Sequence, residues 1–294
     1  MAKRFLSALI NLIRLIRYRF LLFAGLLPYC LGAAIAYRSV SAFDPGLFLT
    51  GLIGIFFTLV GVEAFNEYFD WVSGTDRVFQ PDPKPVTKKK FYIGVAAFAI
   101  ALLFAVYLTL QVGAGIAIFA VAGFIAAAGY LGPPLRFAYR GLGEAVIALS
   151  YGPAMVLGSY YLQTAQIDFL PAVVSAIPAI FLFSIAIINE VPDFLQDSLV
   201  GKRNICVRNG RERTVAIYGY MSVVLYITLA MLAFADLLPK SCLLILLTLP
   251  LAWRNYSTAR AKLDAPQELF GAIRGTLIIY IISMGILIGS YLKS

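Results

Sequence analysis

The sequence predicts an all-α, polytopic membrane protein with nine transmembrane helices. Of the 294 residues, 61% are hydrophobic, whereas a soluble domain is about 45–50% apolar. The apolar residues come in long runs, and short basic segments separate these runs. At about 20 residues per crossing, this content is enough for roughly nine helices. Long runs exclude a soluble enzyme and also a β-barrel, in which apolar residues alternate with polar ones.

The apolar runs are bounded by charged or turn-rich residues, which fixes their order along the chain. The expected spans are centred near Leu27, Ile55, Leu102, Phe119, Ala148, Phe181, Val224, Leu246 and Ile282. The segment 1–16 carries Lys3, Arg4 and Arg14 among apolar residues. It is predicted to be an amphipathic segment at the membrane interface rather than a cleaved signal. We expect one integral-membrane domain over 1–294.

The basic residues predict which side of the membrane each loop faces. With the N-terminus in the cytoplasm, 21 of the 24 Lys and Arg residues fall on the cytoplasmic side, and Arg38, Lys240 and Lys293 fall outside. This bias follows the positive-inside rule and supports both the orientation and the helix count. The net charge of +9 therefore belongs to loops at a lipid bilayer, and no nucleic-acid partner is expected. The sequence leaves the oligomeric state open.

The chain contains no His. This absence excludes haem or zinc bound through His, and also Ser/His and Cys/His catalytic pairs. The three cysteines, Cys30, Cys206 and Cys242, have neither metal-like spacing nor the even count of a disulfide framework. Any bound metal must therefore have oxygen ligands.

The second and sixth predicted spans end with the same pattern, N-E-x-x-D, at 66–70 and 189–193. The copies lie four crossings apart, so both open on the same side, here the cytoplasm. This spacing predicts two parallel four-helix units that face each other, with one extra helix. Duplicated polar elements at interrupted helices commonly enclose a site in membrane proteins.

Residues four apart share one face of a helix. The motifs can therefore direct oxygen atoms into one cavity from Asn66 and Asp70 on one helix and from Asn189, Asp193 and Asp197 on the other. Asp76 lies six residues beyond Asp70 and can join only if the helix ends near Gly74.

Carboxylates at the end of a membrane helix cost free energy unless they are paired with a cation or bind a metal. The acids of these two motifs therefore indicate a functional site. Oxygen ligands without His or Cys suit Mg²⁺, which completes its coordination shell with water and phosphate oxygens. Cations near the acids favour a diphosphate leaving group; they are Arg77, Lys84, Arg136 and Lys202. For Lys84, Arg136 and Lys202, a plain positive-inside role is an equal alternative, and for Lys88–Lys90 it is the preferred one.

These motifs resemble the UbiA superfamily of intramembrane prenyltransferases, with its N-D-x-x-D-x-x-x-D and D-x-x-x-D elements. The resemblance runs from about Arg17 to the ninth span. The segments 66–76, 139–144 and 201–210 are most similar to the 1,4-dihydroxy-2-naphthoate polyprenyltransferase branch. Two departures are Glu67 in place of the usual Asp, and N-I-C at 204–206 in place of T-L-A.

The resemblance implies roles for individual residues. Asn66, Asp70 and Asp76, together with Asn189, Asp193 and Asp197, would hold Mg²⁺ on an allylic diphosphate. Lys84 and Arg136 would bind diphosphate oxygens, and Arg17 matches a family arginine unless a shift of two residues selects Arg19. Tyr130 is among the aromatic residues that could shield the allylic cation.

The implied chemistry is ionisation of a polyprenyl diphosphate and capture of the cation by an electron-rich aromatic acceptor. That acceptor is expected to be 1,4-dihydroxy-2-naphthoate, as in menaquinone biosynthesis, with Glu144 orienting it or accepting a proton. Hydroxybenzoate, a chlorin, a haem or a glycerophosphate lipid are the alternative acceptors. A cation-coupled transporter is the rival from another class, although acids at helix ends beside cations favour a diphosphate site. A CDP-alcohol phosphotransferase, which also uses Mg²⁺ and intramembrane aspartates, is a second enzymatic rival. Its D-x-x-D-G-x-x-A-R element is absent from this sequence.

Overall fold

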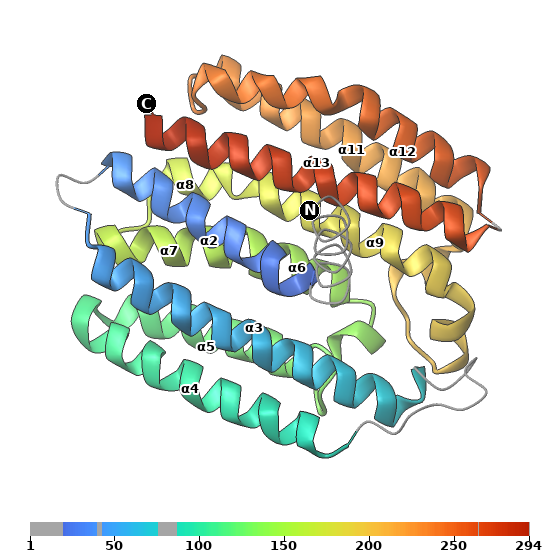
Figure 1. Ribbon diagram of the computed structural model, residues 1–294, viewed down its shortest axis with the longest axis horizontal. Helices are drawn as coiled ribbons and strands as arrows, with labels where there is room; N and C mark the ends of the chain where they lie inside the picture. The colour runs from blue at the N-terminus through green and yellow to red at the C-terminus, as the bar shows by residue number, and fades with distance from the viewer. Residues whose placement is uncertain (1–19, 40–42, 76–86, 264, 294) are drawn as a thin grey trace, which may run out of the picture.

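The computed structural model describes residues 20–39, 43–75, 87–263 and 265–293. Every regular element in these ranges is helical, which confirms the all-α prediction. The long helices lie side by side with their axes roughly aligned (Figure 1). The predicted interfacial segment 1–16 lies outside the described residues.

The long helices of the first half are α2 (Phe20–Ser39), α3 (Pro45–Ser73), α4 (Lys89–Val112) and α5 (Ala114–Gly129). A loop with the short η2 (Phe137–Tyr139) leads to a bent span made of α6 (Gly143–Leu149), η3 (Ser150–Ala154) and α7 (Met155–Thr164). The second half contains α8 (Phe169–Val174), α9 (Ala176–Leu199), α10 (Ile205–Asn209), α11 (Arg211–Phe234), η4 (Lys240–Thr248), α12 (Leu249–Ala261) and α13 (Pro266–Lys293).

Six segments in the described part of the chain are long and apolar enough to cross a membrane. They are Pro45–Ser73, Lys89–Val112, Gly143–Thr164, Phe169–Leu199, Arg211–Phe234 and Glu268–Lys293. All nine expected centres lie within helical elements. However, α5 has 16 residues, and the segment around Leu246 is a 3₁₀ helix followed by the 13-residue α12. The count of nine crossings and the two four-helix units remain predictions.

Helix α9 is the central helix of the bundle. Of the most apolar stretch of the span Phe169–Leu199, which contains α8 and α9, 61% is buried, against 28% for α4 and for α11. Helix α9 packs against α6, α11 and α13, and α13 in turn packs against α2. The fully buried residues Ile177, Phe181 and Ile188 supply part of its packing surface. The end of α9 is therefore held in place by several neighbouring helices.

The sequence sets both ends of α3. At its start, the side chain of Asp44 accepts hydrogen bonds from the N–H groups of Gly46 and Leu47, at 2.7 and 3.0 Å. At its end, Gly74 adopts a left-handed conformation with φ of 92°, and its N–H bonds to the carbonyl of Trp71. This conformation suits glycine because it has no Cβ. The helix thus ends near Gly74, which is the condition for Asp76 to join the other motif acids.

Candidate functional site

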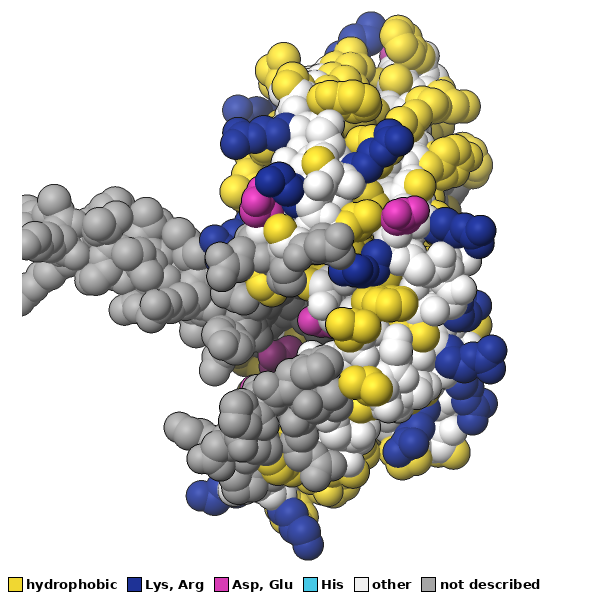
Figure 2. Space-filling view, turned by 90° about the vertical axis from the view of Figure 1, so that its right-hand side faces the viewer, with side chains coloured by type: hydrophobic (Ala, Val, Ile, Leu, Met, Phe, Trp, Pro, Cys, Tyr) yellow, Lys and Arg dark blue, Asp and Glu magenta, His cyan; other side chains and the backbone are white. Residues whose placement is uncertain are grey.

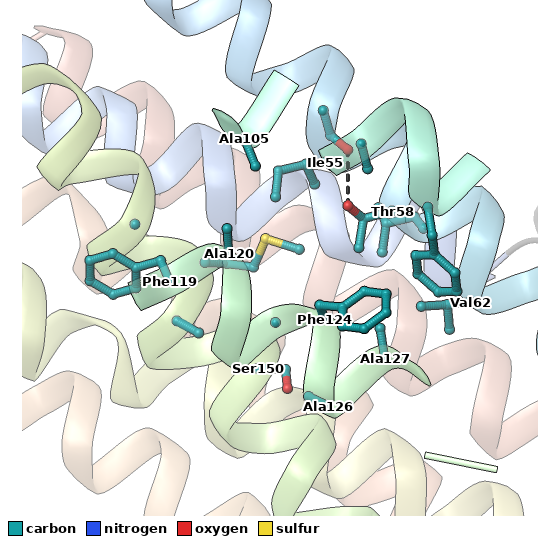
Figure 3. A pocket seen from close by; sticks show the side chains of 18 of the residues that line it. Ile55, Thr58, Val62, Ala105, Phe119, Ala120, Phe124, Ala126, Ala127 and Ser150 are labelled. Carbon is teal, nitrogen blue, oxygen red and sulfur yellow. Dashed lines mark hydrogen bonds between the residues drawn. The ribbon is translucent and has the colours of Figure 1, made fainter. Parts of the chain in front are cut away.

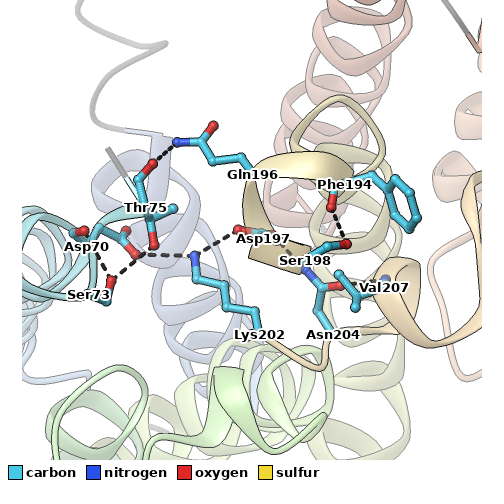
Figure 4. Close-up of polar contacts among 10 residues, drawn as sticks. All are labelled: Asp70, Ser73, Thr75, Phe194, Gln196, Asp197, Ser198, Lys202, Asn204 and Val207. Atoms are coloured by element: carbon cyan, nitrogen blue, oxygen red, sulfur yellow. Dashed lines mark hydrogen bonds and ion pairs between the residues drawn. The ribbon is translucent and has the colours of Figure 1, made fainter. Parts of the chain in front are cut away.

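The ends of α3 and α9 meet at one lysine. The ammonium nitrogen of Lys202 lies 3.2 Å from Oδ1 of Asp70 and 3.1 Å from Oδ1 of Asp197 (Figure 4). The side chains of Lys202 and Asp197 are 13% and 7% exposed. An acid from each sequence motif therefore shares a single cation at this end of the bundle.

The chain after α9 folds back onto Asp197. The N–H of Lys202 bonds to the carbonyl of Asp197 at 3.0 Å. The side-chain amide of Asn204 donates to Oδ2 of Asp197 at 2.7 Å, while its carbonyl oxygen caps α10 by accepting from Val207 N–H at 2.8 Å. Asn204 thus links the acidic end of α9 to the start of α10, and the loop holding Lys202 is fixed at both ends.

The end of α3 is hydrogen-bonded to the end of α9 near Asp197. The Ser73 hydroxyl donates to the carbonyl of Asp70 at 3.1 Å and lies 3.0 Å from the Thr75 hydroxyl. The Gln196 side-chain amide donates to the carbonyl of Thr75 across the gap from α9 (Figure 4). These contacts hold Asp70 beside Asp197 without requiring a bound ligand.

Two opposing effects act on the charge of Lys202. Burial disfavours the ammonium form and lowers the pKa of Lys202. The nearby carboxylates of Asp70 and Asp197 have a larger, opposite effect, so the pKa of Lys202 is raised above its ordinary value. Lys202 is therefore a permanent cation at neutral pH.

The two motif glutamates have partners other than Lys202. Glu67 forms an ion pair with Lys90 on α4. Glu190 accepts a hydrogen bond from Cys206 N–H at 3.1 Å, and Glu144, which is 2% exposed, accepts from Ile205 N–H. Glu144 and Glu190 thus hold the first turn of α10, which follows directly on the Lys202 loop.

The remaining predicted residues lie in different surroundings. Asn66 and Tyr130 line a large apolar cavity next to the acidic site. The Asn189 amide donates to the carbonyl of Ile185 in its own helix at 2.8 Å. Asp193 and Arg136 are exposed. Arg17, Asp76, Arg77 and Lys84 lie outside the described residues, so their roles stay predictions.

Two site residues were missed from the sequence. Tyr139 has a buried hydroxyl without a hydrogen-bond partner among the described residues, and its ring centroid lies 5.5 Å from the Arg136 guanidinium and 6.0 Å from the Lys202 ammonium. The other is Asn204. Its position as an asparagine just before a short helix is a recognisable capping signal.

The donor atoms fit a hard divalent cation such as Mg²⁺. Within the described ranges, no group of three or more His, Cys, Asp or Glu side chains is placed to hold a metal ion. However, Asp70 and Asp197 already converge on one positive charge, and both offer the oxygen atoms that Mg²⁺ prefers. Mg²⁺ usually takes one or two carboxylate ligands from a protein, and phosphate oxygens and water complete its coordination shell.

The end of the bundle that carries this site is also rich in basic side chains. Figure 2 looks onto this end, where Lys and Arg side chains surround a few acidic ones. Exposed basic residues here include Lys89, Arg203, Arg208 and Arg213. An anionic substrate would therefore approach through a positive field.

Comparison with known proteins identifies the family. A model of the UbiA prenyltransferase family matches residues 25–281, so the chain belongs to this family. It is 27% identical over 213 residues to the 1,4-dihydroxy-2-naphthoate octaprenyltransferase of Bacillus subtilis, covering 69% of this chain and 68% of that protein. It is 26% identical to the rat UbiA prenyltransferase domain-containing protein 1, covering 71% of this chain and 64% of that protein. The matched region thus spans about two thirds of the length of these relatives.

Solved structures show the same fold. A UbiA homologue from Aeropyrum pernix K1 superimposes with a TM-score of 0.68 at 13% identity, covering 92% of this chain and 96% of that one. A UbiA homologue from Archaeoglobus fulgidus bound to DMAPP and Mg²⁺ gives a TM-score of 0.55 at 14% identity, covering 94% and 99%. The protein is therefore a UbiA-type prenyltransferase with several apolar membrane helices.

Proposed function

We propose that this protein transfers a polyprenyl group from an allylic diphosphate to 1,4-dihydroxy-2-naphthoate, using Mg²⁺. The observation that carries the proposal is the convergence of Asp70 and Asp197, from separate motifs, on Lys202. A magnesium ion held by these two carboxylates would neutralise charge on the departing diphosphate. Asn66, Asn189 and Asp193, with Asp76, are proposed as further oxygen ligands.

Basic and aromatic side chains would bind the diphosphate and shield the cation. Lys202 and Arg136 flank the ring of Tyr139, and their charges would stabilise the developing negative charge on the phosphate oxygens. Arg17, Arg77 and Lys84 are proposed to add to this set. The apolar cavity that begins at Asn66 and Tyr130 would hold the isoprenoid chain, with the Tyr130 ring near the allylic carbon.

The choice of acceptor is supported by the Bacillus subtilis relative, whose name specifies 1,4-dihydroxy-2-naphthoate. Two ring oxygens make a naphthalenediol nucleophilic enough to capture an allylic cation without a strong protein base, which suits a chain that lacks His. Contact of Glu144 with the acceptor stays a prediction, because its carboxylate bonds to Ile205 N–H here.

The location is proposed to be the cell membrane, with the N-terminus and the active site on the cytoplasmic side. The support is the distribution of Lys and Arg, of which 21 among 24 fall on that side in the nine-span arrangement.

A product assay tests the activity. Purified protein with Mg²⁺ and a long-chain polyprenyl diphosphate is given dihydroxynaphthoate, 4-hydroxybenzoate, chlorophyllide, haem and geranylgeranylglyceryl phosphate, and the products are identified by mass. We expect prenylated dihydroxynaphthoate. Prenylation of another acceptor alone would contradict the substrate assignment. Absence of any prenylated product and of diphosphate release would favour the transporter.

A further inference from the structure

The Tyr139 hydroxyl is a buried polar group that its protein surroundings leave unsatisfied. Its oxygen atom is shielded from solvent, yet it has no hydrogen-bond partner among the described residues. Buried hydroxyl groups in proteins are nearly always hydrogen-bonded, because an unpaired one costs free energy. Beside the acidic site, such a hydroxyl is a candidate group for binding a ligand.

The loop that carries Tyr139 is held firmly in place. Tyr139 ends η2, and its N–H bonds to the carbonyl of Arg136 at 2.9 Å. Two residues further on, the carbonyl of Gly141 accepts a hydrogen bond from Arg208 on α10 at 3.3 Å. The backbone packs so closely here that a Cβ atom at Gly141 would lie 2.7 Å from the carbonyl oxygen of Arg203. The loop therefore has little freedom to turn the hydroxyl toward another protein group.

Two cations lie beside the ring of Tyr139. The ring centroid is 5.5 Å from the Arg136 guanidinium and 6.0 Å from the Lys202 ammonium. Tyr139 also acts electrostatically on Lys202. The hydroxyl is thus a hydrogen-bond donor in a positive environment, and this combination suits a multiply charged anion.

The apolar cavity offers no alternative place for such an anion. It has a volume of about 580 Å³, and its described lining contains no charged side chain. Its wall is mostly hydrocarbon, and the Thr58 hydroxyl there bonds to the carbonyl of Gly54 at 3.0 Å (Figure 3). Phosphate groups inside it would lack a counter-charge. The cavity reaches Tyr130, whose carbonyl accepts from Ala138 N–H at 3.0 Å, so the Tyr139 loop lies next to the cavity.

We propose that the Tyr139 hydroxyl donates a hydrogen bond to an oxygen of the donor's diphosphate group, a role that rests on the proposed prenyltransferase activity. When the carbon–oxygen bond of the allylic diphosphate breaks, both electrons leave with the diphosphate, and its oxygens gain negative charge. A fixed donor bonded to these oxygens therefore stabilises the transition state more than the bound substrate. Tyr139 keeps its proton throughout and acts as a catalytic residue beside Arg136 and Lys202.

The test is Tyr139→Phe, which keeps the ring beside the two cations and removes only the hydroxyl. The Kd for inorganic diphosphate, measured by calorimetry in detergent with Mg²⁺, should rise about tenfold because a charge-assisted hydrogen bond is lost. The kcat/KM for a polyprenyl diphosphate should fall about tenfold or more. The ligand-free melting temperature should stay unchanged or rise, since an unpaired buried hydroxyl is removed.

Tyr226→Phe is the matched control. Tyr226 on α11 is buried, and its hydroxyl lies 2.7 Å from the Thr248 hydroxyl. Removing this hydroxyl breaks a hydrogen bond that the folded protein already makes. The control should therefore show the reverse pattern, with a lower melting temperature and an unchanged Kd for diphosphate.

An unchanged Kd for diphosphate in Tyr139→Phe would overturn the inference, as would a wild type that binds no diphosphate. A fall in the ligand-free melting temperature like that of Tyr226→Phe would also overturn it, because the hydroxyl would then already have a partner. Failure of the proposed function looks different. The wild type would form no prenylated product with any acceptor, while the diphosphate measurement uses no acceptor and still reports on Tyr139.

Discussion

Asp70 and Asp197 would repel each other across the gap between α3 and α9 if no cation lay between them. In this structure the Lys202 ammonium, 3.2 and 3.1 Å from their carboxylates, supplies that charge. All three side chains are largely buried, so removing one partner leaves uncompensated charge in a poorly solvated place. Lys202 therefore holds the two motifs together before any ligand binds.

Lys202→Gln should destabilise the metal-free protein by about 3 kcal/mol, because two partly buried carboxylates lose their cation. Mg²⁺ should then raise the melting temperature of the variant more than that of the wild type, since the metal no longer competes with an ammonium group. The measurement is thermal unfolding in detergent with and without Mg²⁺. The control is Lys262→Gln, whose ion pair with Glu268 is about half exposed and should contribute little. Equal Mg²⁺ shifts in the wild type and Lys202→Gln would contradict this role.

Asp70→Asn and Asp193→Asn should each lower kcat/KM by about 10²-fold or more. Asn keeps the size of the side chain but removes the charge of a proposed metal ligand. Steady-state rates are measured over a range of Mg²⁺ concentrations. Folded variants with wild-type rates at limiting Mg²⁺ would show that the two-motif metal site is wrong.

At the scale of elements, the five-residue helix α10 positions the Lys202 loop. Its first turn is held from two directions, by Glu144 at the start of α6 and by Glu190 on α9. Its cap is the side chain of Asn204, which also bonds to Asp197. A displacement of α10 would therefore move Lys202 relative to both acids.

Substitutions of Glu144 separate a structural role from a chemical one. Glu144→Ala leaves the Ile205 N–H without its acceptor and should cost about 1–3 kcal/mol. Glu144→Gln keeps a carbonyl oxygen that can accept this bond, so its melting temperature should stay closer to that of the wild type. Equal loss in both variants would contradict the anchoring role. If Glu144→Gln also keeps its activity, Glu144 is not the proton acceptor, since an amide cannot take that proton.

Local patterns predicted much of this region. The i, i+4 spacing marked Asp70 and Asp197 as inward-facing acids, and Gly74 marked the end of α3, because both signals lie within a few residues of chain. The backbone contact of Glu144 with Ile205 joins residues 61 positions apart. No short-range pattern encodes such a contact, so the sequence does not predict it, and a contact of Glu144 with the acceptor stays a prediction. For Lys202, the sequence leaves a phosphate-binding role and a plain positive-inside role equally open, and it does not reveal that Asp70 and Asp197 share its charge.

At the scale of the whole molecule, one end of the bundle gathers the acids and many exposed basic residues (Figure 2). The positive-inside rule predicts that this end faces the cytoplasm. A substrate with a charged head and an apolar tail would then have its head at this end and its tail among the helices.

Cysteine labelling in intact cells tests this orientation. A Cys at Ser73 should react with a membrane-impermeant maleimide only after the membrane is opened, whereas Lys240→Cys should react from outside. Native Cys206 should add little background, because burial raises the pKa of its thiol to about 11 and little thiolate exists at neutral pH. Labelling of the Ser73 position from outside alone would overturn the orientation.

The most direct test of the central claim, that Asp70 and Asp197 form one site, is a double-mutant cycle on kcat/KM. Asp70→Asn, Asp197→Asn and the double variant are compared with the wild type at saturating Mg²⁺. If both carboxylates act through one cation position, each single change should cost about 10²-fold or more, and the double variant should lose little beyond the worse single one. A double variant whose loss equals the product of the two single losses would show independent sites and contradict the claim.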